Sequence, residues 1–190
     1  EARDLNLMLT SPFNLFDGVM AKIERETEHA LAGRKARIIA KVNALAEPSV
    51  VTALYDASAA GVKIDLIVRG VCSLRPGVPG LSDNIRVRSI LGRFLEHSRV
   101  YYFMNGGEEE IYCASADWME RNLLRRNESC FPIMDEALRE QIKDDLEFYL
   151  ADNSYAWRLH GDGHYERLSP GSAPRICAQE TFLERIALLN

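Results

Sequence analysis

The stretch RIIAKVNALAEPSVVTALYDASAAGVKIDLIV, residues 37–68, decides the fold class. Its first six residues, 37–42, form a short apolar segment that predicts a strand, and residues 62–68 alternate in hydropathy as a second strand does. Residues 48–60 begin with a proline and are followed by a glycine, which is how many helices begin and end. A strand, a helix and a strand within about thirty residues form a βαβ unit, which predicts two parallel strands.

The chain on either side of this unit predicts further helices and strands. Ser11 and Pro12 look like the N-cap and the first position of a helix whose apolar residues recur with helical spacing until Gly33. The remaining expected elements are strands at 84–90 and 128–134, hairpins at 97–117 and 155–168, and helices at 135–151 and 179–189. The sequence therefore predicts an α/β fold in which a mixed sheet is flanked by helices.

Length and cysteine usage indicate one domain in a reducing compartment. We expect residues 1–190 to form a single domain, with 152–190 as a C-terminal extension made of a hairpin and a helix. The four cysteines are far apart in sequence, which disfavours a zinc site and favours reduced thiols and a cytoplasmic location. We find no apolar run of transmembrane length and no signal-peptide layout at the first residues.

The distribution of charge favours an anionic ligand in the middle of the chain. The net charge is -5, which argues weakly against a nucleic-acid binder. Residues 63–126 nevertheless hold ten Lys/Arg against eight Asp/Glu, and nine of those ten cations are arginines. Because arginine binds phosphate through two parallel hydrogen bonds, this segment is the one in which we expect a phosphate site.

A hairpin in this segment, LEHSRVYYFMNGGEEEIYCASADWMERN at 95–122, carries the densest set of candidate residues. His97 and Arg99 are two residues apart at the start of its first expected strand, so strand alternation predicts that they share a face. A turn at 105–107 then returns the chain, and the second strand delivers Ser115 to Asp117 near that face. An imidazole, a guanidinium and hydroxyl donors together suit a phosphate. Arg99 could equally pair with a carboxylate such as Glu96, Asp117 or Glu128.

The ends of the two parallel strands predict where this ligand lies. Arg69 follows the second strand and opens a long loop, 69–83, that is rich in Gly, Pro and Ser. In open α/β sheets ligands bind beyond the carboxyl ends of the strands, so Arg69 is a candidate clamp on phosphate charge. Lys41 and Asn43 end the first strand and could lie on the same side, although a plain loop role is equally compatible with the sequence.

Two polar clusters are expected to have no ligand. The acidic run Glu108–Glu110 lies at the tip of the hairpin, where we expect it to be solvated and to hold no magnesium. His160 and His164 flank the turn Gly161–Gly163, and we expect them to face solvent, so we predict no metal site in this chain.

Several long motifs resemble one known family. The segments are 10–26, 38–70, 67–103, 106–126 and 170–185, which include IVRGVCSLRPGVPGLSDN, FLEHSRVYYF and CASADWMERNLLRR. They resemble the C-terminal part of bacterial polyphosphate kinase, and the resemblance covers nearly the whole chain. It implies a phospholipase D-like fold, that is, a mixed sheet flanked by helices.

The resemblance also implies an activity for the parent enzyme. Members of this family reversibly transfer the terminal phosphate of ATP to inorganic polyphosphate through a phosphohistidine. That histidine and the magnesium ligands belong to a preceding domain, which this chain does not match. The resemblance therefore implies ATP or ADP and polyphosphate as ligands, the remaining enzyme domains as partners, and homo-oligomers of the full-length protein. We expect the chain alone to have little or no kinase turnover.

Two arginines and one histidine of this chain match family positions that bind nucleotide phosphate. They are Arg69 in VRG, His97 in LEHSRV and Arg126 after RNLLR. The resemblance implies that His97 is also needed for activity, as an acid or base. Arg99 would be a fourth phosphate ligand. Sequence alone hardly separates Arg126 from its neighbour Arg125.

Two other classes of function remain open from the sequence. The His-x-Arg motif resembles half of the phospholipase D signature, with Arg99 in place of the lysine and Asp117 in place of an asparagine. Two such halves in a homodimer would form a phosphodiesterase. The other possibility is a non-catalytic module for polyphosphate binding or oligomerisation.

Overall fold

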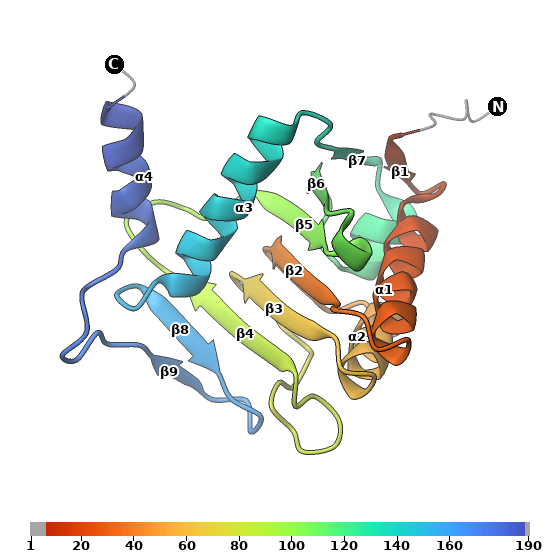
Figure 1. Cartoon of the computed structure of the whole chain (residues 1–190), viewed down its shortest axis with the longest axis horizontal. Coiled ribbons are helices and arrows are strands. Elements are labelled where there is room, and N and C mark those ends of the chain that lie inside the picture. Colours follow the sequence, from red (N-terminus) through yellow and green to blue (C-terminus); the bar gives the residue numbers. More distant parts are fainter. Residues whose placement is uncertain (1–6, 189–190) are drawn as a thin grey trace.

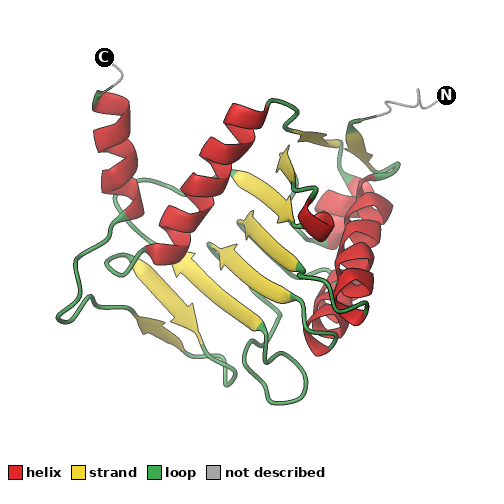
Figure 2. Cartoon of the chain, in the orientation of Figure 1, coloured by secondary structure: helices red, strands yellow, loops and turns green. Residues whose placement is uncertain are grey.

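A computed structural model describes residues 7–188, and its centre is one mixed sheet of nine strands (Figures 1 and 2). The strands lie in the order β1-β7-β6-β5-β2-β3-β4-β8-β9. In chain order the elements are β1 (Leu9–Ser11), α1 (Leu15–Leu31), β2 (Arg37–Val42), α2 (Pro48–Ala59), β3 (Lys63–Val68), β4 (Ile85–Ile90), β5 (Arg99–Phe103), β6 (Glu110–Ala114), β7 (Glu128–Pro132), α3 (Glu136–Ala151), β8 (Ala156–Leu159), β9 (Tyr165–Arg167) and α4 (Ala178–Ala187). A 3-10 turn (Asn105–Gly107) and a π-helical turn (Arg121–Arg125) complete them.

The predicted βαβ unit is confirmed and sets the directions of the central strands. β2 and β3 are parallel, and β4 is parallel to β3. β5 pairs antiparallel with β2 on its other side, followed by β6 and β7, each antiparallel to its neighbour. The carboxyl ends of β2, β3, β4 and β6 therefore lie at the same edge of the sheet as the amino ends of β5 and β7. We call this the carboxyl edge and the other end of these strands the amino edge.

Helices cover the two faces of the sheet unequally. α1 and α2 pack on one face, where Leu15, Ile23 and Leu54 join a large core with the inward side chains of β2 and β3. α3 crosses the opposite face (Figure 1) and buries Leu146 against a smaller cluster that includes Ile39. This two-sided burial explains why β2 reads as a nearly continuous apolar run. The predicted mixed sheet flanked by helices is thus confirmed.

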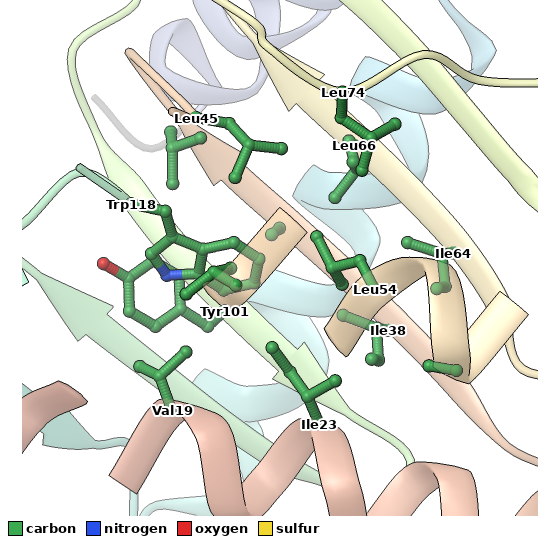
Figure 3. Close-up of a cluster of buried hydrophobic side chains, with 14 of the residues drawn as sticks. Val19, Ile23, Ile38, Leu45, Leu54, Ile64, Leu66, Leu74, Tyr101 and Trp118 are labelled. Atoms are coloured by element: carbon green, nitrogen blue, oxygen red, sulfur yellow. The ribbon is translucent and has the colours of Figure 1, made fainter. Parts of the chain in front are cut away.

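Trp118 is the largest fully buried side chain of the described residues, and it lies directly after the hairpin (Figure 3). Its indole packs against Tyr101 with the ring centroids 5.2 Å apart. The Tyr101 hydroxyl donates a hydrogen bond to the carbonyl of Ala116. The backbone carbonyl of Trp118 accepts from the amides of Ala46 and Glu47, just before α2. These contacts attach the end of the hairpin to the core and so fix Asp117, which lies between Ala116 and Trp118.

The predicted start of the first helix is wrong. α1 begins at Leu15 and not at Pro12, and its N-cap residue is Asn14. Ser11 belongs instead to β1, a short strand that the sequence analysis missed, and pairs with Glu128 of β7. The side chain of Asn14 accepts from the amide of Thr10 at 2.7 Å, which closes the turn before the helix. The predicted helix end is confirmed, since Gly33 has a positive φ of 72°.

The acidic run at the hairpin tip is also less solvated than predicted. Glu110 pairs with Lys22 and Arg25 of α1 at 3.2 Å and 2.9 Å. Glu109 pairs with Lys143 of α3 at 2.7 Å and accepts from Tyr102. The basic partners come from helices far away in sequence, so the run alone could not reveal them.

The C-terminal segment continues the same sheet. β8 pairs antiparallel with β4, and β9 pairs with β8. Asp152 is buried, and its carboxylate accepts from the amides of Ser154, Tyr155, Ala156 and Ala178, which ties the end of α3 to the start of α4. The last predicted helix runs from Ala178 to Ala187; its predicted end at Leu189 lies outside the described residues. No described helix has the length and apolar character needed to cross a membrane.

Candidate functional site

The carboxyl edge brings together candidate residues from three neighbouring strands. Asn43 directly follows β2, Arg69 directly follows β3, and His97 lies two residues before β5. The Arg69 amide donates to the carbonyl of Val42 at 3.1 Å, and the Gly70 amide donates to the carbonyl of Asn43 at 2.9 Å. Because β2 lies between β5 and β3, Asn43 stands between His97 and Arg69 along this edge.

The prediction that His97 and Arg99 share a strand face is wrong. β5 begins at Arg99, and His97 lies exposed in the preceding loop, so strand alternation does not apply to it. Arg99 forms a two-point ion pair with Asp117, with Nε–Oδ1 at 3.1 Å and Nη2–Oδ2 at 3.2 Å. Its Nη1 donates to the carbonyl of His97 at 3.1 Å. The alternative that Arg99 pairs with a carboxylate is therefore confirmed for Asp117, and Arg99 also holds the backbone of His97.

Asp117 connects this pair to the next strand. Its Oδ1 accepts from the amide of Asn43 at 2.7 Å as well as from Arg99. Asp117 is only 6% exposed. Its buried carboxylate joins the chain after β6 to the end of β2. Such a carboxylate aligns two neighbouring groups of the carboxyl edge.

A buried ion pair supports the loop that carries His97. Lys41 Nζ lies 3.0 Å from Glu96 Oε2, and the two side chains are 3% and 9% exposed. Lys41 also donates to Oγ of Ser98 at 2.9 Å, so it contacts the residues on both sides of His97. Burial lowers the pKa of Lys41; Glu96 opposes this shift, whereas the charges of Arg69 and Arg99 add to it.

Two helices hold Glu96 from the other side. Gln179 of α4 donates from Nε2 to Glu96 Oε1 at 2.6 Å. Burial, and then the charge of Glu96 and a hydrogen bond to it, raises the pKa of Tyr149 on α3. The His97 loop is therefore fixed by β2, α3 and α4 together, although the His97 side chain itself is exposed.

The carboxyl edge has more positive than negative charge near its centre. Lys41, Arg69 and Arg99 are close enough for the two arginines to depress the pKa of Lys41. The carboxylates that offset them are Glu96 and Asp117, each already engaged with Lys41 or Arg99. Arg69 has a buried Nη1 without a hydrogen-bond partner in the part of the chain that the structure describes. An anion at this edge would supply the missing acceptor.

The structure separates Arg125 from Arg126 more clearly than the sequence did. Arg125 pairs with Glu120 within the π-helical turn. Arg126 follows that turn, is exposed, and has no ion pair among residues 7–188. Nearby, Glu128 accepts from Ser115 and from Asn122, the latter at 2.6 Å. Arg126 is therefore the arginine of this pair that remains available to a ligand.

The site is an open edge, and three hollows in the described part of the chain do not include Asn43, Arg69 or His97. One hollow of about 560 Å³ is at the amino edge, where Arg37, Lys63 and Arg86 line it. We place the candidate site at the carboxyl edge because the paired, buried and unpartnered polar groups are concentrated there. Within residues 7–188, no group of three or more His, Cys, Asp or Glu side chains is arranged to hold a metal ion.

Sequence reasoning missed the Lys41–Glu96 pair and left Asn43 undecided. The pair is separated by more than fifty residues, and nothing in either segment marks the other as its partner. A lysine in the apolar strand RIIAKV was the available signal, because a lysine buried in a strand needs a counter-charge. His160 and His164 stack with their ring centroids 4.2 Å apart, and they pair with Glu166 and Asp162 within their own hairpin.

Comparison with known proteins identifies the family of this chain. The model of the family described as "Polyphosphate kinase C-terminal domain 2" matches residues 8–179. A polyphosphate kinase from Xylella fastidiosa is 63% identical over 185 residues, which are 96% of this chain and 26% of that protein. The chain thus spans about a quarter of the length of the curated relatives it matches.

Solved structures give the same result for the fold. The crystal structure of polyphosphate kinase from Porphyromonas gingivalis superposes with a TM-score of 0.91 at 40% identity, covering 95% of this chain and 28% of that one. Nuc from Salmonella typhimurium, a phospholipase D family member, has a TM-score of 0.55 at 15% identity over 84% of this chain and 96% of its own. This second likeness shows that the fold is phospholipase D-like. The chain belongs to the family of polyphosphate kinase C-terminal domain 2.

Proposed function

We propose that this chain is one half of the active site of a polyphosphate kinase and binds the phosphates of ATP, ADP and polyphosphate at its carboxyl edge. The parent enzyme transfers the terminal phosphate of ATP to polyphosphate and back. The observation that supports this most is the unpartnered guanidinium nitrogen of Arg69 beside two further cations, Lys41 and Arg99. Family membership supports the reaction, and the excess of cations supports the ligand class.

Each candidate side chain has a distinct role in this proposal. Arg69 and Arg126 stabilise the negative charge that develops on the phosphates, which is most of what phosphoryl transfer requires. His97 exchanges a proton with an attacking or leaving phosphate oxygen. Arg99 contacts phosphate less directly than we expected from sequence, because Asp117 already holds two of its nitrogens. Its role is to orient His97 through the carbonyl of that residue.

The rest of the proposal concerns parts of the enzyme beyond this chain. The phosphohistidine and the groups that hold magnesium are supplied by the remaining domains, which also complete the open edge. We propose that residues 1–190 act as one domain with 152–190 as its extension, that the whole enzyme is oligomeric, and that it works in the cytoplasm. The chain alone therefore binds phosphates without turning over ATP.

Replacing Arg69 by alanine is expected to weaken the binding of tripolyphosphate and ATP to the chain by about 10- to 100-fold. The reason is the loss of charge-assisted hydrogen bonds worth about 1.5–3 kcal/mol, at 1.4 kcal/mol for each factor of ten. Isothermal titration calorimetry of the purified chain measures both affinities.

Arg86→Ala is the matched control, because Arg86 is an exposed arginine at the amino edge and its loss removes the same charge. Its affinities are expected to stay within about twofold of the unaltered chain, less than 0.5 kcal/mol. If both variants lost the same affinity, the loss would come from the change in net charge, and this would contradict a site at Arg69. Steady polyphosphate synthesis by the chain alone would contradict its role as half of a site.

A further inference from the structure

Asn43 is a buried residue whose side-chain amide has no partner. It is 7% exposed, and neither Oδ1 nor Nδ2 has a hydrogen-bond partner among residues 7–188. Its backbone is fully engaged, since the amide donates to Asp117 and the carbonyl accepts from Gly70. A buried amide without partners is costly to the folded protein, and nearly all buried polar groups in proteins are paired. Folding alone therefore gives no reason for an asparagine at this position.

The place of Asn43 in the sheet indicates what its partner is. β2 is flanked by β5 and β3, so Asn43 lies between the loop of His97 and the start of the 69–83 loop. Its contact with Asp117 connects it to Arg99, and its contact with Gly70 connects it to Arg69. A ligand that extends from Arg69 to His97 along this edge passes over Asn43.

A second buried atom without a partner limits the choice further. The Nη1 of Arg69 is also buried and without an acceptor. An Asn Nδ2 and an Arg Nη1 are both donors. Two donors whose residues follow adjacent parallel strands, beside an excess of positive charge, fit an anion and not a cation. A tetrahedral phosphate has enough oxygens to accept from both residues at once.

We propose that Asn43 is a phosphate-binding residue, whose Nδ2 donates to an oxygen of the phosphate that Arg69 also holds. Asn43 holds that phosphate between Arg69 and His97, and its Oδ1 accepts from a donor of the same bound complex. The unpaired amide costs free energy in the protein without ligand, and its hydrogen bond to the bound phosphate offsets that cost. This inference rests on the proposed function, because it assigns one more residue to the same phosphate site.

Two substitutions at Asn43 test this assignment. Asn43→Leu removes both unpaired polar atoms and keeps the branched shape with a larger volume, and Asn43→Asp keeps shape and size but replaces the NH₂ donor by a negative oxygen. We expect Asn43→Leu to weaken tripolyphosphate binding by about 10-fold or more, and Asn43→Asp to weaken it further because the carboxylate repels phosphate. Calorimetric titration of the chain with tripolyphosphate measures each affinity.

The thermal unfolding midpoint distinguishes binding from a structural role. Removing a buried polar group that has no partner is neutral or stabilising, so the Tm of ligand-free Asn43→Leu is expected to equal or exceed that of the unaltered chain. Asn84→Asp is the matched control, since Asn84 is exposed near the amino edge and the change of charge is the same. It is expected to bind tripolyphosphate within about twofold of the unaltered chain, less than 0.5 kcal/mol.

The outcomes separate this inference from the proposed function. An unaltered chain that binds tripolyphosphate, with Asn43 variants that bind it equally well, would overturn the role of Asn43 alone. A lowered Tm for Asn43→Leu, with equal loss of affinity in the Leu and Asp variants, would assign Asn43 to structure and also overturn it. Absence of binding by the unaltered chain would overturn the proposed function, and the role of Asn43 with it.

Discussion

Replacing His97 by alanine is expected to lower polyphosphate synthesis by about 10²- to 10⁴-fold, the usual contribution of a positioned acid or base. The assay requires a complete enzyme, which is obtained by exchanging the matching quarter of the Xylella fastidiosa polyphosphate kinase for this chain. The high identity of the two sequences makes correct assembly of this chimera the expected result. The rate of ADP formation from ATP, with and without the substitution, gives the effect.

The expected effect is large because several buried groups hold the loop of His97 in place. Lys41 and Glu96 form a buried ion pair next to it, Arg99 holds its carbonyl, and Gln179 holds Glu96 from α4. Buried charge pairs are costly to build and are weak evidence for stability, so their presence under an exposed histidine indicates a requirement for its position.

His160→Ala in the same chimera is the matched control. His160 is a partly exposed histidine on a surface hairpin, paired with Glu166. Its substitution is expected to change the rate by less than about threefold, since surface pairs contribute little. A His97→Ala chimera that keeps more than a tenth of the rate would remove His97 from the proposed chemistry.

Replacing Trp118 by alanine is expected to reduce the free energy of unfolding by about 3–5 kcal/mol, as for other fully buried tryptophans. Trp118 is 0% exposed and packs on Tyr101 within the main core (Figure 3). Removing it leaves a cavity next to the chain segment that positions Asp117. Urea denaturation of the isolated chain, followed by circular dichroism, measures the change through the shift of the midpoint.

Trp157→Ala serves as the comparison, because Trp157 is the other tryptophan and lies half-buried on β8 near the edge of the sheet. It is expected to cost less than half as much. Trp118→Phe, which restores most of the ring volume, is expected to recover a large part of the loss. Equal destabilisation by Trp118→Ala and Trp157→Ala would contradict the core assignment.

The parts of the fold with strong local signals were predictable from sequence. The βαβ unit was predicted because Pro48 and Gly61 mark the ends of a helix between two apolar runs. The start of α3 was predictable for the same reason, since the side chain of Asp135 accepts from the amide of Leu138 as an N-cap does. β1 was not predictable, because three residues are too few for a periodic pattern and its pairing partner is β7, more than a hundred residues later.

Some residues of the candidate site were likewise predictable from sequence, and others were not. Arg69 could be placed at the carboxyl edge from the strand before it, without any knowledge of its contacts. The orientation of His97 relative to the strand could not be predicted, because the strand begins two residues later, at Arg99, which is held by Asp117. The unpartnered amide of Asn43 is invisible to sequence reasoning, since it depends on the absence of neighbours in three dimensions.

Amide chemical shifts show directly whether phosphate binds at the carboxyl edge of the sheet. A chain labelled with ¹⁵N is titrated with tripolyphosphate and its backbone amide resonances are followed. We expect saturable shifts at Asn43, Gly70, His97 and their neighbours, with little change at Lys63 and Arg86 on the amino edge. Shifts concentrated at the amino edge, or spread over all exposed cations without saturation, would contradict it.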